Sequence, residues 1–332
     1  MADNQLQHIS SQTQHANAAP RKTSDHLQQF GMQPQQTNAQ SQHSGNQRHT
    51  STPCHISGQI VRLWAYAGII IVVAIIVALF AIILSQGASC ISWDFITQTP
   101  GGDELGSEGG IAPAIIGSLW LTGCALVLGG IPALVCALYL TFYCRHDRIA
   151  SCLHVLLNGL AGTPSIIFGL FSYSFIVQGL GIGRSVFAAG SALALMIFPF
   201  IEIRIEKAFQ EIPHNLIASS YALGCSRLYV LRTICIPCSI GDIVAAFVLG
   251  GCYAMGATAP LMFTGGVAFA PAPQSLTDPV MALPLHLYLL VAQGDSMTQA
   301  YGTAFVLMII ILIGNALVAY VAYRRKKQWN NS

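Results

Sequence analysis

Charged residues are scarce in this chain. Asp, Glu, Lys and Arg together make up 8% of its 332 residues, whereas hydrophobic residues make up 53%. A soluble domain usually carries about a quarter charged residues. So few charges cannot cover a surface that faces water, and the composition therefore excludes an ordinary soluble domain. It predicts a protein that crosses the lipid bilayer several times.

A framework of extracellular disulfides is not indicated, although the chain has ten cysteines. Nearly all of them lie in apolar runs or in loops expected in the cytosol, and only Cys90 is expected outside. Cys235 and Cys238 have the spacing of a redox or metal-binding pair, but no second pair of ligands accompanies them. We expect both to pack as small apolar residues. No metal site, bound cofactor or nucleic-acid partner is expected.

Catalytic motifs are missing as well. The sequence has no Gly-Lys-Ser/Thr of a nucleotide-binding P-loop. It has no nucleophile elbow and no His/Glu pair of a metallohydrolase. We therefore expect a protein that is not an enzyme, so that any nucleotide hydrolysis must be done by another chain.

Residues 1–57 differ from the rest of the chain. They are rich in Gln, Ser, Asn and His, and no apolar periodicity runs through them. Such a segment cannot repay the entropy that it would lose on ordering, so we expect a disordered tail in the cytosol. Metal binding by its irregularly spaced histidines is the alternative. The other residues divide into a membrane domain over 58–327 and a short cytosolic tail over 328–332.

Six apolar blocks make up the membrane domain. A hydrocarbon core of roughly 30 Å needs about 20 apolar residues in a helix. We therefore predict an all-α polytopic membrane protein with six transmembrane helices, over residues 63–84, 111–143, 153–177, 186–201, 243–259 and 303–323. The apolar stretch over 281–291 is too short to cross the bilayer and is predicted to be a re-entrant or surface helix.

The positions of Lys and Arg predict the orientation, because loops that stay in the cytosol are enriched in both. With both termini in the cytosol, only Arg184 of the fifteen basic residues falls outside. The loop over 85–110 has acidic residues but no Lys or Arg, so it is expected on the external side.

The segment over 202–242 is the only long charged stretch inside the membrane domain. A short helix is predicted before Gly224, which can close it in a left-handed conformation, and a second helical piece leads on to the membrane. Such an elbow suits docking into a groove of a soluble partner, although an ordinary amphipathic loop is the alternative. Its spacing resembles the EAA loop of ABC-importer permeases. The residues concerned are Glu206, Pro213, Ala218, Ser219, Ser220, Gly224, Ile234 and Pro237, with Ala218 in place of the family's Glu.

Other segments resemble the PstA branch of these permeases, in order along the chain: 109–117, 160–170, 253–260, 282–288 and 300–304. The resemblance covers about 58–327. It implies a MetI-like permease in the bacterial inner membrane that forms half of the translocation path of an ATP-driven phosphate importer. It also implies three partners: a second, PstC-like permease, a PstB-like ATPase dimer that carries the ATP, and an external PstS-like phosphate-binding protein.

The substrate path is expected at breaks in the membrane helices. A proline there frees backbone groups, which must lie against protein or a water-filled path, and transporters place anionic substrates at such breaks. The resemblance assigns six residues to this path: Pro164, Ser165, Tyr253, Ala257, Thr258 and Pro260. For Pro164, a simple kink that serves packing is an equal alternative.

Two of these positions depart from the PstA pattern, which has Arg and Glu where this chain has Tyr253 and Ala257. The fork of an Arg matches two phosphate oxygens, and a Glu one turn away would hold it in an empty site. Both charges are missing together, which leaves no unpaired charge. Three hypotheses follow: phosphate transport with the charge supplied by a partner permease, transport of another small anion, or a non-transporting scaffold in phosphate signalling.

Overall fold

The protein is helical through most of the part that the structure describes. The computed structural model describes residues 55–101, 106, 108–293 and 296–330, and the strand-like pairs within them are two isolated bridges. The chain divides into two units after Trp64, and the account below concerns the unit from Ala65 onward. The tail predicted over 1–57 lies almost entirely outside the described residues.

Five helical stretches are long and apolar enough to cross a membrane: Val61–Ala88, Ala112–Tyr143, Val186–Gln210, Arg227–Met255 and Met297–Ala322. A sixth candidate consists of two helices bent by 97° at their junction, Asp147–Ala161 and Ser165–Gly179. If this bent pair forms one span, the described residues contain the six predicted spans. The all-α architecture is confirmed.

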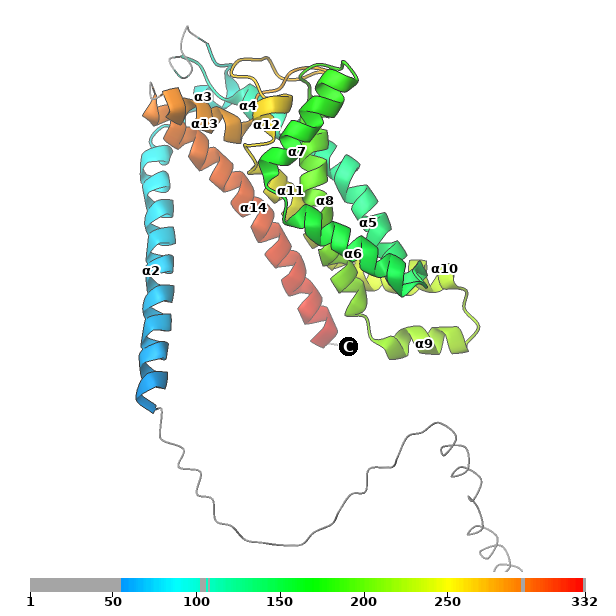
Figure 1. Ribbon diagram of the computed structural model, residues 1–332. Coiled ribbons are helices and arrows are strands. Elements are labelled where there is room, and N and C mark those ends of the chain that lie inside the picture. The colour runs from blue at the N-terminus through cyan, green and yellow to red at the C-terminus, as the bar shows by residue number, and fades with distance from the viewer. Residues whose placement is uncertain (1–54, 102–105, 107, 294–295, 331–332) are drawn as a thin grey trace, which may run out of the picture. The chain divides into compact units, whose positions relative to one another are not determined.

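Several spans are built from more than one helical segment (Figure 1). The spanning segments are α2 (His55–Ala88), α4 (Ala112–Ala125), η2 (Leu126–Gly130), α5 (Ile131–Leu138), η3 (Tyr139–Tyr143), α6 (Asp147–Ala161), α7 (Ser165–Ser172), η4 (Tyr173–Gly179), α8 (Val186–Gln210), α10 (Arg227–Val230), η5 (Leu231–Cys235), α11 (Ile236–Met255) and α14 (Met297–Asn330). The η segments are π-helical. The short connecting helices are α3 (Trp93–Thr97), α9 (His214–Ala222), α12 (Leu261–Thr264) and α13 (Leu283–Gln293).

Some helix ends differ from the predicted ones. α8 continues past 201 to Gln210, because isolated charged side chains do not interrupt the backbone ladder and the next proline is Pro213. The helical rod that contains α11 begins at Arg227 rather than at 243, with Pro237 in the first turn of α11. The third span is two helices rather than one, because Pro164 adopts ψ 135° and so stops the helix before α7.

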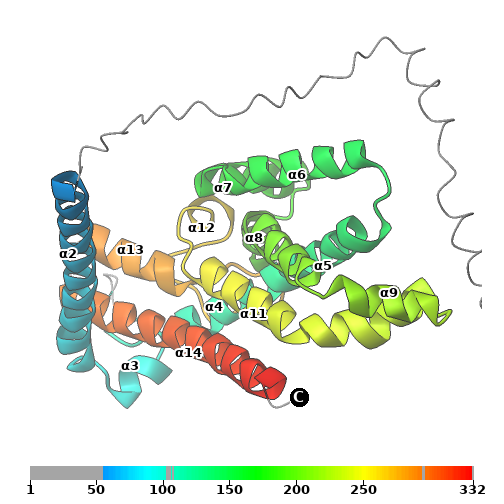
Figure 2. The same cartoon turned by 90° about the horizontal axis from the view of Figure 1, so that it is seen from below.

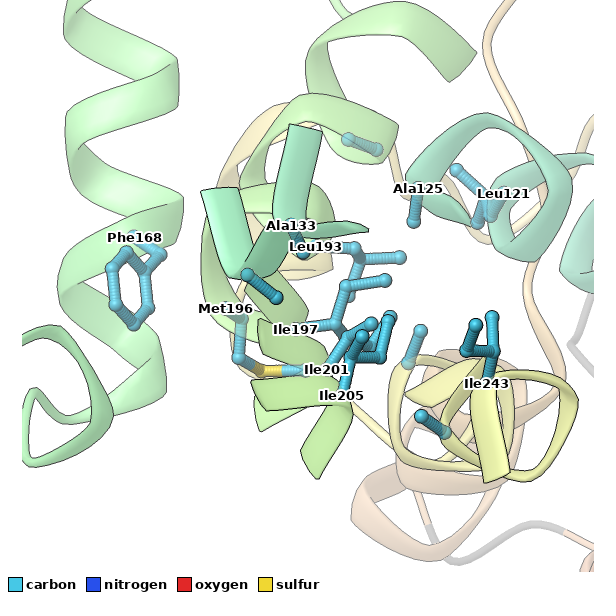
Figure 3. Packing of buried hydrophobic residues seen from close by; sticks show 14 of the residues in the cluster. Leu121, Ala125, Ala133, Phe168, Leu193, Met196, Ile197, Ile201, Ile205 and Ile243 are labelled. Carbon is cyan, nitrogen blue, oxygen red and sulfur yellow. The ribbon is translucent and has the colours of Figure 1, made fainter. Parts of the chain in front are cut away.

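α8 lies at the centre of the main core. It packs against α4, η2, α5, α6, α7 and α11, and Figure 2 shows its end-on position between α5, α7 and α11. In Figure 3 Leu193, Ile197 and Ile201 of α8 point into the space shared with Leu121 of α4 and Ile243 of α11.

The backbones of η2 and α8 approach so closely in this core that one position on η2 requires a glycine. A Cβ atom added to Gly129 of η2 would lie only 2.5 Å from the carbonyl oxygen of Ala194 on α8. Any larger residue would therefore push the two segments apart. The first turn of α8 is also well defined, because the Ser185 hydroxyl accepts a hydrogen bond from the Ala188 N–H at 3.2 Å.

Candidate translocation path and coupling elbow

A second helix break lies between α11 and α12. α11 ends at Met255, and Gly256 follows as its C-terminal cap. The Ala257 N–H still donates to the Ala254 carbonyl at 3.2 Å, after which the chain leaves the helix and restarts at Leu261. The predicted break before Pro260 is thus present, and it extends over the residues from Gly256 to Pro260.

The second break packs against the helix that follows the first break. A Cβ atom on Gly169 of α7 would lie 2.8 Å from Pro260 Cα and 2.9 Å from the Pro260 carbonyl oxygen. α7, which follows the Pro164 break, therefore packs directly on the proline that starts α12. The sequence assigned both prolines to the path, but it did not predict that Gly169 makes the contact.

Hydrogen bonds from a side chain and from the backbone connect these segments to α8. The Ser172 hydroxyl donates to the Ala188 carbonyl at 2.8 Å from a fully buried position. The Thr264 hydroxyl donates to the Pro260 carbonyl at 2.8 Å, and the Thr264 carbonyl accepts from the Ser185 N–H at 3.3 Å. Both broken spans are thus held against the first turns of α8.

The six predicted path residues do not form one cluster. Pro260 is buried against Gly169, whereas Pro164 is exposed and Ser165 is half-buried in the first turn of α7. Ala257 and Thr258 are half-buried in the second break. Tyr253 is 49% exposed on the last turn of α11.

Tyr253 instead contacts an aromatic side chain of α8. Its ring centroid lies 5.5 Å from that of Phe200, with the two rings tilted by 33°. The guanidinium carbon of Arg204 lies 4.9 Å from the centroid of the same Phe200 ring. Phe200 and Arg204 were not predicted as site residues. Their spacing of one helical turn was the available signal, because residues at i and i+4 share a helix face.

Two carboxylates lie on another face of α8. Glu202 is fully buried, and neither of its carboxylate oxygens has a hydrogen-bond partner. Glu206 is also buried; its Oε1 accepts from the Gln210 side chain at 3.0 Å and lies 3.5 Å from Nε2 of His154 on α6. Glu206 therefore belongs to the end of α8 and not to the loop where it was expected. No group of three His, Cys, Asp or Glu side chains suited to a metal occurs among the described residues.

The elbow consists of α9, a turn at Gly224 and α10. Pro213 precedes α9, and Gly224 has φ +81°, a conformation that side chains with a Cβ rarely adopt. The hydroxyls of Ser219 and Ser220 donate back to carbonyls one turn earlier in α9, at 2.7 and 2.8 Å. These two serines thus stabilise the elbow internally, and Ala218 is exposed beside them.

The tip and the base of the elbow differ in burial. At the tip, Leu223 is 84% exposed, and Tyr221 and Leu228 are exposed nearby. At the base, Val230 and Leu231 are buried in the main core, to which Ile234 adds partly buried contacts. An apolar tip on a firmly anchored base is a suitable shape for docking and for transmitting a force.

Comparisons with known proteins agree with this architecture. The family model described as "Binding-protein-dependent transport system inner membrane component" matches residues 109–327. The "Probable phosphate transport system permease protein PstA" of Methanocaldococcus jannaschii is 32% identical over 73% of this chain and 82% of that protein. The "Phosphate transport system permease protein PstA" of Haemophilus influenzae is 31% identical over 62% of this chain and 72% of that protein.

Solved structures support the fold. A chain of the MetNI methionine ABC transporter in an inward-facing conformation aligns with a TM-score of 0.51 at 21% identity, covering 63% of this chain and 96% of its own length. A chain of a bacterial alginate ABC transporter aligns with a TM-score of 0.53 at 16% identity, covering 81% and 96%. The family match and the curated relatives lead to one conclusion: this chain belongs to the inner membrane components of binding-protein-dependent transport systems, as a MetI-like permease of the PstA type.

Proposed function

We propose that this chain is a permease subunit of an ATP-driven phosphate importer and forms half of its translocation path. Phosphate is inferred as the substrate from the names of the relatives, which are phosphate transport permeases. The observation that supports the mechanism is the contact of the second break, at Pro260, with Gly169 of α7, the helix that follows the first break. Breaks of this kind let membrane helices move as separate segments and expose backbone groups to a substrate.

ATP hydrolysis takes place on a separate ATPase dimer, PstB-like, which docks on the elbow of α9, Gly224 and α10. Exposed Leu223 and Tyr221 supply the apolar contacts at the tip. The shape of the elbow, and of the helical segment that leads from it back to the membrane, depends on six residues: Pro213, Ala218, Ser219, Ser220, Ile234 and Pro237. Both chain termini lie in the cytosol with the elbow.

Two further partners complete the importer. A second, PstC-like permease forms the other half of the path, and an external PstS-like protein delivers phosphate to it in the bacterial inner membrane. This chain contributes six residues to the path: Pro164, Ser165, Tyr253, Ala257, Thr258 and Pro260.

The test is ATP-dependent uptake of radiolabelled phosphate by vesicles that contain the assembled complex. Gly224→Asp places a side chain on a backbone with φ +81° and distorts the elbow, so we expect uptake to fall by about tenfold or more. Gly181→Asp is the matched control, because Gly181 has φ +68° and open space around it, but lies far from the elbow in sequence. Equal uptake by the two variants would contradict coupling through the elbow.

Another small oxyanion is the second candidate cargo, favoured by Tyr253 and Ala257 in place of the charged pair of the PstA pattern. The same vesicles distinguish the two cargoes. A phosphate importer takes up phosphate in the presence of excess sulfate, whereas strong inhibition by sulfate would favour the broader oxyanion role.

A further inference from the structure

One exposed arginine lies on the face of α8 that meets α11. Arg204 follows Phe200 by one helical turn, and its guanidinium carbon lies 4.9 Å from the centroid of the Phe200 ring. The Tyr253 ring of α11 lies against the same Phe200 ring, with the two centroids 5.5 Å apart and the rings tilted by 33°. The three side chains form an aromatic column, here defined as Tyr253, Phe200 and Arg204, in which the Phe200 ring favours a guanidinium placed over it.

The acidic residues of α8 do not neutralise this arginine. Glu202 and Glu206 stand two positions before and after Arg204, and residues two apart do not share a helix face. Both carboxylates are buried, whereas Arg204 is exposed. Glu206 instead lies 3.5 Å from His154, and the Arg204 guanidinium has no hydrogen bond or ion pair with the described residues.

The surroundings of an uncompensated guanidinium in a membrane helix are restricted. Arg204 lies in the last two turns of the candidate span Val186–Gln210, directly after the largely apolar stretch 186–203. At this end of a membrane helix a guanidinium reaches the interface, where it meets water or a polar partner instead of lipid tails. The half-exposed Tyr253 hydroxyl, which donates no hydrogen bond to a described residue, lies on the same column.

We propose that the aromatic column lines the path and that Arg204 binds the phosphate oxyanion near the cytosolic mouth. This inference rests on the proposed function and names the cation that the path otherwise lacks in this chain. Arg204 stands 18 residues after Val186, the first residue of α8, which is about 27 Å along the helix. The site therefore lies at the exit side of the path.

Each member of the column has a separate role. The guanidinium fork of Arg204 donates two parallel hydrogen bonds to oxygens of one phosphate. The Phe200 ring holds the plane of this fork, and the Tyr253 hydroxyl offers one hydrogen bond on the far side of the ring. Phosphate thus meets Tyr253 first and Arg204 second as it leaves.

The experiment compares Arg204→Gln, Arg204→Lys and Arg148→Gln in the assembled importer. Arg148 is exposed near the start of α6 and controls for loss of one positive charge. We expect Arg204→Gln to lower phosphate uptake by about tenfold while ATP hydrolysis stimulated by the binding protein continues. Arg204→Lys should restore part of the uptake, because it retains the charge but not the fork. Arg148→Gln should stay within about twofold of wild type.

Two outcomes overturn the inference. Equal uptake by Arg204→Gln and Arg148→Gln excludes a role of Arg204 in the path. Parallel loss of uptake and ATP hydrolysis in Arg204→Gln, as expected for Gly224→Asp, assigns Arg204 to assembly or coupling.

Lipid headgroups offer the same phosphate chemistry, so a second arm separates the two sources. The measurement is repeated in vesicles of galactolipids, which carry no phosphate. If Arg204 binds transported phosphate, the ratio of wild-type to Arg204→Gln uptake is unchanged; if it binds headgroups, wild type falls to the level of the variant.

A complex that assembles but takes up no phosphate would overturn the proposed function and not, by itself, the site. Thermal unfolding in galactolipid vesicles then decides. A rise in the unfolding temperature on adding millimolar phosphate, present in wild type and absent in Arg204→Gln, supports an oxyanion site. The same rise in both proteins overturns it.

Discussion

α2 and α8 are both apolar helices long enough to cross a membrane, yet their surroundings differ. In the most apolar window of each helix, 67% of α8 is buried inside the chain and none of α2. α2 is nevertheless the more apolar of the two. Lipid tails offer apolar contact to any helix, so hydrophobicity alone does not bury a helix in a bilayer.

The buried helix is distinguished by small and polar residues. Its first turns contain buried Ala188, Ala189, Gly190 and Ala192, which let neighbouring helices approach. α8 also carries the buried Glu202 and Glu206, whereas α2 has no acidic residue and no basic residue after Arg62. Close packing and polar contacts therefore identify the helix at the centre of this permease.

The largest effect on this comparison should come from Gly129→Leu. The new side chain would collide with the Ala194 backbone and separate η2 from α8, at a cost of about 3 kcal/mol in the free energy of unfolding. Gly68→Leu on α2 is the control, because no atom lies within 4 Å of a Cβ at that position. The control should gain up to about 1 kcal/mol from helix propensity. Thermal unfolding of both purified variants measures the difference, and equal destabilisation would contradict the packing argument.

A second prediction concerns the stability of the protein at low pH, which a buried histidine outside the spans should reduce. His286 of α13 is 2% exposed, and neither ring nitrogen has a hydrogen-bond partner. Burial lowers the pKa of the His286 imidazole to about 4. The unfolded chain, with an ordinary pKa of about 6.5, binds the proton first, so stability is retained above pH 6.5 and lost as the pH falls towards 4. We expect a loss of up to roughly 3 kcal/mol over this range.

The measurement is the unfolding temperature against pH for wild type and His286→Leu. The variant should lose less stability between pH 6.5 and pH 4 than wild type. An identical pH dependence in both proteins would show that other groups cause the acid sensitivity.

The smallest expected effect is a difference in the free energy of unfolding between variants of the two buried carboxylates of α8, Glu202 and Glu206. Glu202→Met removes a buried group without partners and should raise the free energy of unfolding by about 1–2 kcal/mol. Glu206→Met removes the hydrogen bond from Gln210 and the contact with His154, and should lower it by a similar amount. Opposite shifts in the unfolding temperature are the expected result; shifts of the same sign would indicate that the two sites are equivalent.

Local chemistry explains what the sequence could predict. Pro164 and Gly224 act on their own backbone, so the bend between α6 and α7 and the turn of the elbow could be predicted from neighbouring residues. The end of α8 could not, because Glu202 suggests the edge of a membrane helix when its burial is unknown. The contact of Tyr253 with Phe200 joins residues far apart in the chain, and no local pattern specifies such a contact.

The hydrogen bond from the Ser239 hydroxyl to the Ala208 carbonyl, 3.3 Å long, connects α11 with α8 just above the elbow. Because of this bond, a displacement of the elbow acts on the adjoining ends of both helices together. α8 is about 37 Å long at 1.5 Å per residue, so a tilt of about 5° at its base shifts the opposite end by roughly 3 Å. If an ATPase docks on the elbow as proposed, a small displacement there would therefore become a larger one at the Val186 end of α8.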